Sequence, residues 1–191
     1  KAGGTDAVTI DSSGNVGIGA TPVGYAAVLS ALQLGGNANI AAESATAASQ
    51  FLHISQNANF DTDNSWEYIS TDEASSYYQN SGTHVWRYAA SGTAGSDISW
   101  SEAMRIDSSG RVGIGLSPTA PLTIKSNTTS GSTSGILLQG NSSTNTIVAI
   151  GEKSTDGGRF HIYDGGVEKI AFYSDGTDNH ISAGNLGIGT I

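Results

Sequence analysis

The stretch AMRIDSSGRVGIG at residues 103–115 decides the fold of this chain. Its apolar residues alternate with small or polar ones, with Met104 and Ile106 before a DSSG turn and Val112 and Ile114 after it. In such a turn the aspartate bonds nearby backbone amides and the glycine accepts a left-handed backbone conformation. The stretch therefore predicts a β-hairpin with one apolar face.

Nearly the same phrase occurs twice more, as IDSSGNVGIG at 10–19 and as HISAGNLGIG at 180–189. The intervals between the copies are wide and unequal, whereas a solenoid returns at a fixed period of about 20–50 residues. The phrase therefore separates larger and different inserts. The third copy departs from the pattern before its glycine, so the register of its hairpin stays open.

The glycines of the phrase lie on the face opposite the apolar residues. Gly113 and Gly115 flank Ile114, and glycine within a strand marks a bulge or a place where another backbone comes close. Because a two-stranded hairpin is marginal alone, this pattern suits packing around an axis where several copies meet. Pro22 and Pro118 are expected to end the strand before the next segment begins.

The composition indicates a thin core. The 191 residues include 26 glycines and no cysteine, and the formal net charge is −9. A chain with so few large apolar residues stays folded more easily when neighbouring copies add burial. The negative charge disfavours nucleic acid and anionic lipid as partners, and no segment approaches the ~20 apolar residues of a membrane span. We expect the chain to be a fragment of a longer protein.

Strand signals dominate the rest of the sequence. Residues 25–36 fit either a short helix or a strand that ends at Gly35, and 39–50 are rich in alanine without an apolar stripe. Residues 164–166 and 174–179 are predicted to be hairpin turns, and 126–135 a loop. Strands are expected, from β-branched and aromatic content, at 51–55, 66–70, 84–89, 97–100, 103–106, 121–125, 135–140, 146–151, 159–164 and 169–175.

AMRIDSSGRVGIG followed by LSPTAPLTIK resembles the repeat of bacteriophage tail-fibre and related virion proteins. Residues 91–115 are similar to the longer unit of such fibres, and FDTDNSWEYIS with YYQNSGTHVWRYA resembles the segment that precedes it. GGVEKIAFYSDGTDNHISAGNLGIGT looks like a diverged second version. The resemblance covers most of the chain, with 36–50 and 126–150 the least clear.

The resemblance implies an all-β, elongated homotrimeric fibre with short β-hairpin repeats and small β-rich inserts. On this basis we expect a first hairpin repeat at 1–24, an aromatic-rich insert at 25–102, a second hairpin repeat at 103–120, a second insert at 121–179 and the start of a third repeat at 180–191. The residues expected to pack at the trimer axis are Ile10, Val16, Ile18, Met104, Ile106, Val112, Ile114, Leu186 and Ile188.

Aromatic residues concentrate in the first insert, where Trp66 and Tyr68 share one expected face and Trp86 and Tyr88 another. Aromatic rings beside polar residues can stack on sugars, so these four residues are the candidate glycan-binding site. The alternative, which we favour for the cluster as a whole, is that these rings form the core of the insert.

Catalytic, metal and cofactor signals are weak. GNVGIGATP lacks the dinucleotide fingerprint and the phosphate-loop lysine. DTDNSWE at 61–67 is a loose echo of a calcium loop without the glycine and the distal glutamate of an EF-hand, which favours a solvated turn. No carboxylate spacing singles out the acid and nucleophile of a glycosidase. We therefore expect no catalytic residues, no metal and no cofactor.

The predicted function is that of a structural tail-fibre segment, not an enzyme, which assists attachment to the host surface, with glycan binding as one route. Its expected location is the virion, outside the cell. Its expected partners are two further copies of itself, other virion tail proteins and a host cell-surface glycan or protein. The alternatives are a connector without a ligand, a polysaccharide-cleaving tailspike domain and a cellular surface adhesin.

Overall fold

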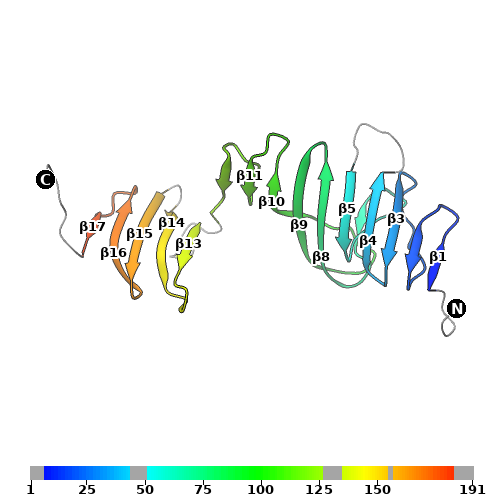
Figure 1. Cartoon of the computed structure of the whole chain (residues 1–191), viewed down its shortest axis with the longest axis horizontal. Coiled ribbons are helices and arrows are strands. Elements are labelled where there is room, and N and C mark those ends of the chain that lie inside the picture. Colours follow the sequence, from blue (N-terminus) through cyan, green and yellow to red (C-terminus); the bar gives the residue numbers. More distant parts are fainter. Residues whose placement is uncertain (1–6, 44–50, 127–134, 155–156, 183–191) are drawn as a thin grey trace. The chain divides into compact units, whose positions relative to one another are not determined.

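The computed structural model describes residues 7–43, 51–126, 135–154 and 157–182, and within them it is all-β without a helix. The chain divides into two units, Lys1–Thr123 and Ile124–Ile191. Figure 1 shows the strands of each unit following one another in chain order. The all-β class is therefore the predicted one, and the sheets of the described residues are open.

The first unit is built on a ten-stranded sheet of order β1-β2-β3-β4-β5-β8-β9-β10-β11-β12. Strands β2 and β3 run parallel, and neighbours from β3 to β11 are antiparallel. The strands are β1 (Val8–Ile10), β2 (Val16–Ile18), β3 (Leu29–Leu34), β4 (Ala38–Glu43), β5 (Phe51–Gln56), β8 (Asp72–Asn80), β9 (Thr83–Gly92), β10 (Ser101–Ile106), β11 (Val112–Ile114) and β12 (Leu122–Ile124). A small hairpin of β6 (Asn59–Phe60) and β7 (Trp66–Glu67) lies outside this sheet.

Both predicted hairpins are present with matching register. Ile10 pairs with Val16 across β1 and β2, and Ile106 pairs with Val112 across β10 and β11. Residues 25–36 contain the strand alternative, β3, and residues 72–80 form a long strand that the sequence did not predict. Residues 97–100 form no strand, and only Trp66–Glu67 of the predicted strand at 66–70 is one.

One row of apolar side chains crosses the first sheet. It takes one residue from each strand from β1 to β5 and from β8 to β11, and the members are Cα partners of their neighbours: Ile10, Val16, Leu32, Ile40, Ile54, Tyr77, Trp86, Met104 and Ile114. We call this side of the sheet the open face, because Ile10 is 68% exposed and Ile54 is 48% exposed.

The neighbouring row points to the opposite side, the inner face, and is mainly polar. Its members are Thr9, Gly17, Gln33, Asn39, Ser55, Ser76, Arg87 and Glu102. Gln33, Asn39, Ser55 and Ser76 are buried. This sheet therefore exposes its apolar row and buries its polar row, the reverse of the usual one-sided sheet.

Irregular segments cover the inner face, and the buried amides bond their backbones. Asn39 donates to the carbonyl of Ala58 at 2.6 Å, and Gln33 accepts the N–H of Val23 at 2.7 Å. Asn57 donates to two further carbonyls. Such segments have no ladder partners, so side-chain amides must satisfy their buried polar groups.

Two small apolar clusters complete the inner layer. Each combines side chains of the inner face with side chains of the covering segments. One holds Ala58, Tyr68, Ala74, Ala89 and Ile98 with Trp66 and Trp100 against it, and the other holds Tyr25, Leu29, Ala31 and Ala41 with Val23, Phe51 and Phe60. The thin core expected from the composition is therefore found on this face.

The strand glycines Gly17 and Gly113 lie close to the backbone of their own chain. A Cβ on Gly17 would lie 2.2 Å from the Ala20 carbonyl oxygen, and one on Gly113 would lie 2.2 Å from that of Leu116. The prolines pack on the same glycines, so that Pro22 lies 2.9 Å from the Gly17 position. The close backbone predicted from the glycines is thus intramolecular, and this face is not free for another copy.

The second unit contains a five-stranded antiparallel sheet in chain order. The turn at 164–166 joins two of its strands, as predicted, with Gly165 and Gly166 at φ of 58° and 80°. The strands are β13 (Ile136–Gln139), β14 (Thr146–Ser154), β15 (Gly157–Asp164), β16 (Val167–Tyr173) and β17 (His180–Ile181).

This sheet also separates apolar from small and polar rows. One row consists of Leu138, Val148, Ile162, Ile170 and Ile181, and a parallel row on the same face consists of Ile136, Ile150, Phe160 and Phe172. The opposite face carries Ala149, His161 and Ala171, all buried. Ile136, Ile150 and Phe172 are exposed, so the second unit has an open apolar face of its own.

Candidate functional site

The open face of the first unit is the candidate functional surface. Its central row contains no charged residue, and it includes the aromatic side chains of Tyr77 and Trp86. The next row on the same face adds Ser75 and Tyr88, which are Cα partners across β8 and β9. Aromatic and aliphatic groups without charge are the composition of an interface core rather than of an ordinary water-exposed surface.

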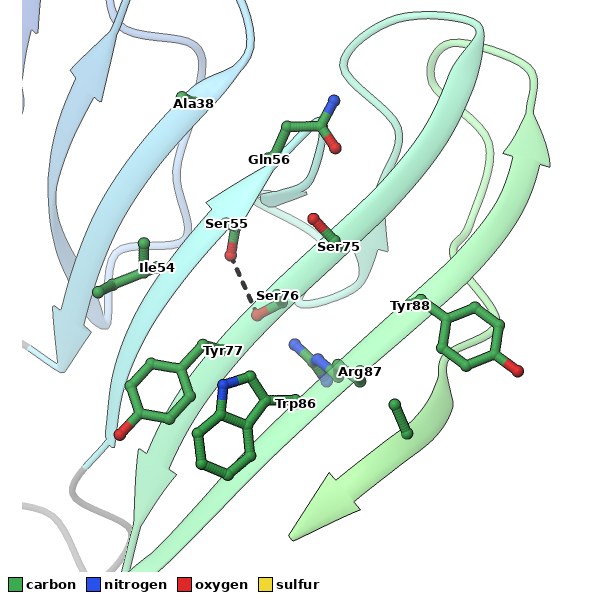
Figure 2. A pocket seen from close by; sticks show the side chains of 11 residues that line it. Ala38, Ile54, Ser55, Gln56, Ser75, Ser76, Tyr77, Trp86, Arg87 and Tyr88 are labelled. Carbon is green, nitrogen blue, oxygen red and sulfur yellow. Dashed lines mark hydrogen bonds between the residues drawn. The ribbon is translucent and has the colours of Figure 1, made fainter. Parts of the chain in front are cut away.

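A groove of about 530 Å³ crosses this face over β5, β8 and β9. Figure 2 shows the rings of Tyr77 and Trp86 side by side at one end, with Tyr88 at the other. The two adjacent rings have centroids 5.0 Å apart. The lining residues are Ala38, Ile54, Ser55, Gln56, Ser75, Ser76, Tyr77, Trp86, Arg87, Tyr88 and Ala103.

Tyr77 is oriented by a hydrogen bond within the open face. Its hydroxyl lies 2.6 Å from Nδ1 of His84, and the two rings stack with centroids 6.1 Å apart. Gln56 and Ser75 bring an amide and a hydroxyl to the groove. This arrangement can hold an apolar or sugar-like surface through ring contact and a few hydrogen bonds.

The structure separates the four predicted glycan-binding residues into two pairs. Trp86 and Tyr88 lie on the open face and are 37% and 55% exposed. Tyr68 is buried, and its hydroxyl donates to the Ala90 carbonyl at 2.5 Å, while Trp66 packs against the same apolar cluster. Trp66 and Tyr68 therefore pack as the core alternative describes, and the buried Tyr68 ring has no face open to a glycan.

Arg87 points away from the groove into an aromatic cage on the inner face. Its guanidinium carbon lies 4.2 Å from the ring centroid of Trp100, 4.8 Å from that of Trp66 and 4.9 Å from that of Tyr78. Burial lowers the pKa of Arg87 to about 10, partly offset by Tyr78. Cation–π contacts take the place that a counter-ion holds in most buried cations.

His53 lies beside this cage, between the rings of Phe51, Trp66 and Tyr78 at centroid distances of 4.8, 4.8 and 5.0 Å. Burial, and secondly the charge of Arg87, lower the pKa of His53 to about 3. The ring is therefore neutral near pH 7.

The residues predicted to pack at a trimer axis all lie on the open face where the structure describes them. Ile10, Ile18 and Ile114 are exposed, whereas Val16, Met104, Ile106 and Val112 are half-buried. Leu186 and Ile188 lie outside the described residues, as does the third copy of the phrase after Ser182.

Sequence reasoning missed several members of this surface, among them Ile54 and Tyr77. Tyr77 lies in the unpredicted strand β8, whose sequence DEASSYYQN has no apolar alternation. Its face could have been found from its neighbour, because Trp86 in β9 lies opposite Tyr77 and carries the stronger pattern.

Comparisons with known proteins identify no relative of this chain: no protein-family model, no curated protein and no solved structure matches it. Within the described residues, no helix has the length and apolar character needed to cross a membrane.

Proposed function

We propose that this chain is a structural segment of a bacteriophage tail fibre, which assembles as a homotrimer and assists attachment to the host surface. The observation that carries the proposal is the open apolar face present in each of the two units. The resemblance of the DSSG-containing phrase to virion fibre repeats supports it.

The exposed apolar residues on the open face of the first unit indicate that this face contacts a partner. Val8, Ile10 and Ile18 at one end and Ile114 at the other are all exposed in the single chain. Contiguous exposed apolar patches on soluble proteins mark interaction sites. Aromatic residues and methionine, such as Trp86 and Met104, are enriched in interface cores, from which charged residues are depleted.

A second copy of the same chain is the partner that fits best. The face is self-complementary in chemistry, because apolar groups on one copy can meet apolar groups on another without an unpaired charge. The second unit repeats the arrangement with different residues, including Ile150 and Phe172. Two unrelated inserts that each leave an apolar face open are explained by one assembly that covers both.

The oligomeric state of the purified chain tests this proposal directly. We expect a trimer by native mass spectrometry and by sedimentation. Ile54→Asp places a charge at the centre of the open face, and it should shift the population toward monomer. Ser12→Asp, in an exposed turn, adds the same charge elsewhere and should leave the trimer intact. A wild-type chain that is a stable monomer overturns the proposal.

A second candidate function is glycan binding in the groove, favoured by the aromatic pair of Tyr77 and Trp86 beside Gln56 and Ser75. This function competes with assembly, because both use the open face. Binding of the purified chain to a glycan array, measured together with its oligomeric state, would support it if the binding is lost in Trp86→Ala but kept in Ser12→Asp. Absence of any binding would leave a connector segment.

A further inference from the structure

The hairpin of β6 and β7 has the same turn as the two hairpins of the repeated phrase. In each turn the N–H of an aspartate donates to the carbonyl four residues later, and its Oδ1 accepts the N–H groups two and four residues later. The aspartates are Asp11, Asp61 and Asp107, and the third residue after each is Gly14, Asn64 and Gly110, at φ of 85°, 68° and 77°.

A comparison of the three turns shows which acidic residues this turn conformation does not require. Where the other two turns carry Ser13 and Ser109, this one carries Asp63. Where the other two hairpins carry Gly17 and Gly113, this one carries Glu67. Since the same backbone forms with serine and glycine at these positions, the turn does not require either carboxylate, although Asp63 Oδ1 accepts the N–H of Ser65 at 3.1 Å.

The added carboxylates converge with that of the turn aspartate. One oxygen from each of Asp61, Asp63 and Glu67 lies within 4.8 Å of the others. In the two turns of the repeated phrase, Asn15 and Arg111 donate to the second oxygen of the turn aspartate at 2.9 and 2.8 Å.

Ser65 stands at the position of those two donors. Its hydroxyl instead donates to Asp97 at 2.8 Å, which brings a fourth acidic residue to the hairpin.

Asn59 provides an independent observation that points to a ligand. It is the Cα partner of Glu67 across the hairpin, it is only 8% exposed, and its Oδ1 is buried without a hydrogen-bond partner. Its Nδ2 donates to the Gly24 carbonyl at 2.8 Å, which fixes the amide. Asn59 and Glu67 line one cavity of about 220 Å³. An ionised carboxylate has no proton to donate to this buried acceptor, whereas a cation in the shared cavity can satisfy it.

We propose that Asp61, Asp63 and Glu67 bind a hard divalent cation, with Ca²⁺ the best fit, and that Asn59 Oδ1 completes the protein ligands. Ca²⁺ takes six to eight oxygen ligands in flexible geometry, so side chains on a surface hairpin with added water suit it. Mg²⁺ demands stricter octahedral geometry, and Zn²⁺ prefers nitrogen and sulfur ligands, which this cluster lacks. The site is distinct from the open face, so it does not depend on the proposed assembly.

Ca²⁺ itself, added to the metal-free full chain, is the probe. Calorimetry should show one saturable site per chain, and Tb³⁺ in its place should luminesce on tryptophan excitation, because Trp66 adjoins Glu67. Asp63→Ser should weaken Ca²⁺ binding about tenfold or more, since affinity depends on the number of charged ligands. Asp63→Ser should leave the fold unchanged, because the two turns of the repeated phrase have serine at this position.

Charge-matched controls make the outcome decisive. Asp164→Asn removes the same charge from the exposed β15–β16 turn and should leave Ca²⁺ affinity unchanged. Asn59→Leu, which removes the buried acceptor, should weaken binding by a smaller factor than Asp63→Ser does. Wild-type chain without a saturable site overturns the proposal, and so does equal affinity in Asp63→Ser and wild type. Loss of binding in Asp164→Asn also overturns it, since it would indicate diffuse attraction to an acidic protein.

Discussion

Trp86 and Met104 are Cα partners across β9 and β10. The first was predicted to bind glycan and the second to pack at a trimer axis, yet both belong to one apolar row. The proposed assembly and the proposed glycan binding would therefore use the same surface of the first unit, and substitutions in this row can tell them apart.

Trp86→Ala is expected to weaken self-association, because the indole presents a large apolar area on the open face. Interface tryptophans commonly contribute about 2 kcal/mol or more to binding. Sedimentation over a dilution series would measure the change in the dissociation constant of the proposed trimer. Trp66→Ala is the matched comparison, and it should lower folding stability instead, because Trp66 packs in the inner layer. Unchanged association in Trp86→Ala, with glycan binding lost, would favour the groove as a ligand site.

Gly17→Ala and Gly113→Ala are each expected to destabilise the first unit by about 1–3 kcal/mol, the usual cost of overpacking. The added methyl would collide with the backbone carbonyl of Ala20 or of Leu116. Thermal denaturation followed by circular dichroism would measure the loss. Gly36→Ala serves as the control, since nothing lies within 4 Å of its Cβ position, and it should change the melting temperature little. A Gly17→Ala variant as stable as wild type would contradict the proposed close packing of the chain.

The hairpins were predictable because their signal is local. The DSSG turn and the alternation around it specify the pairing of Ile106 with Val112 without help from distant residues. The strand β8 was not predictable, because its small and polar side chains lie between two strong strands that set its register. Residues 25–36 fitted two structures, and the pairing of Leu32 with Ile40 decided in favour of the strand.

The side of the sheet that is covered was harder to predict from the sequence than the positions of the strands. Sequence alternation shows that Gln33 and Leu34 point to opposite sides, but it does not show which side is covered. The usual assumption would bury Leu34, which is 40% exposed, and expose Gln33, which is 2% exposed. What decides is the covering segment, whose backbone needs the amide of Gln33. Such long-range demands are not visible in a periodic pattern.

His53 is expected to make the first unit sensitive to acid. Its pKa is about 3 in the folded chain against an ordinary value of 6.5, so the unfolded chain binds the proton more readily. The stabilising contribution is therefore complete above pH 6.5 and is lost as the pH falls toward 3. The full loss is on the order of 5 kcal/mol. Denaturant titrations at several pH values should show this slope, and His53→Phe should reduce it. An equal slope in both proteins would contradict the neutral, buried state of the ring.

Glu168→Gln is expected to lower the pKa of His161 further. Burial already lowers that pKa, and the negative charge of Glu168 opposes the shift. The carboxylate oxygens lie 2.8 Å from Nδ1 of His161 and 3.2 Å from Nε2 of His180. A neutral amide keeps the shape and removes the charge that favours the imidazolium form. NMR titration of the histidine ring protons would follow the change, with Asp164→Asn as the control for net charge. A His161 pKa that rises or stays unchanged in Glu168→Gln would contradict the opposing effect of the Glu168 charge.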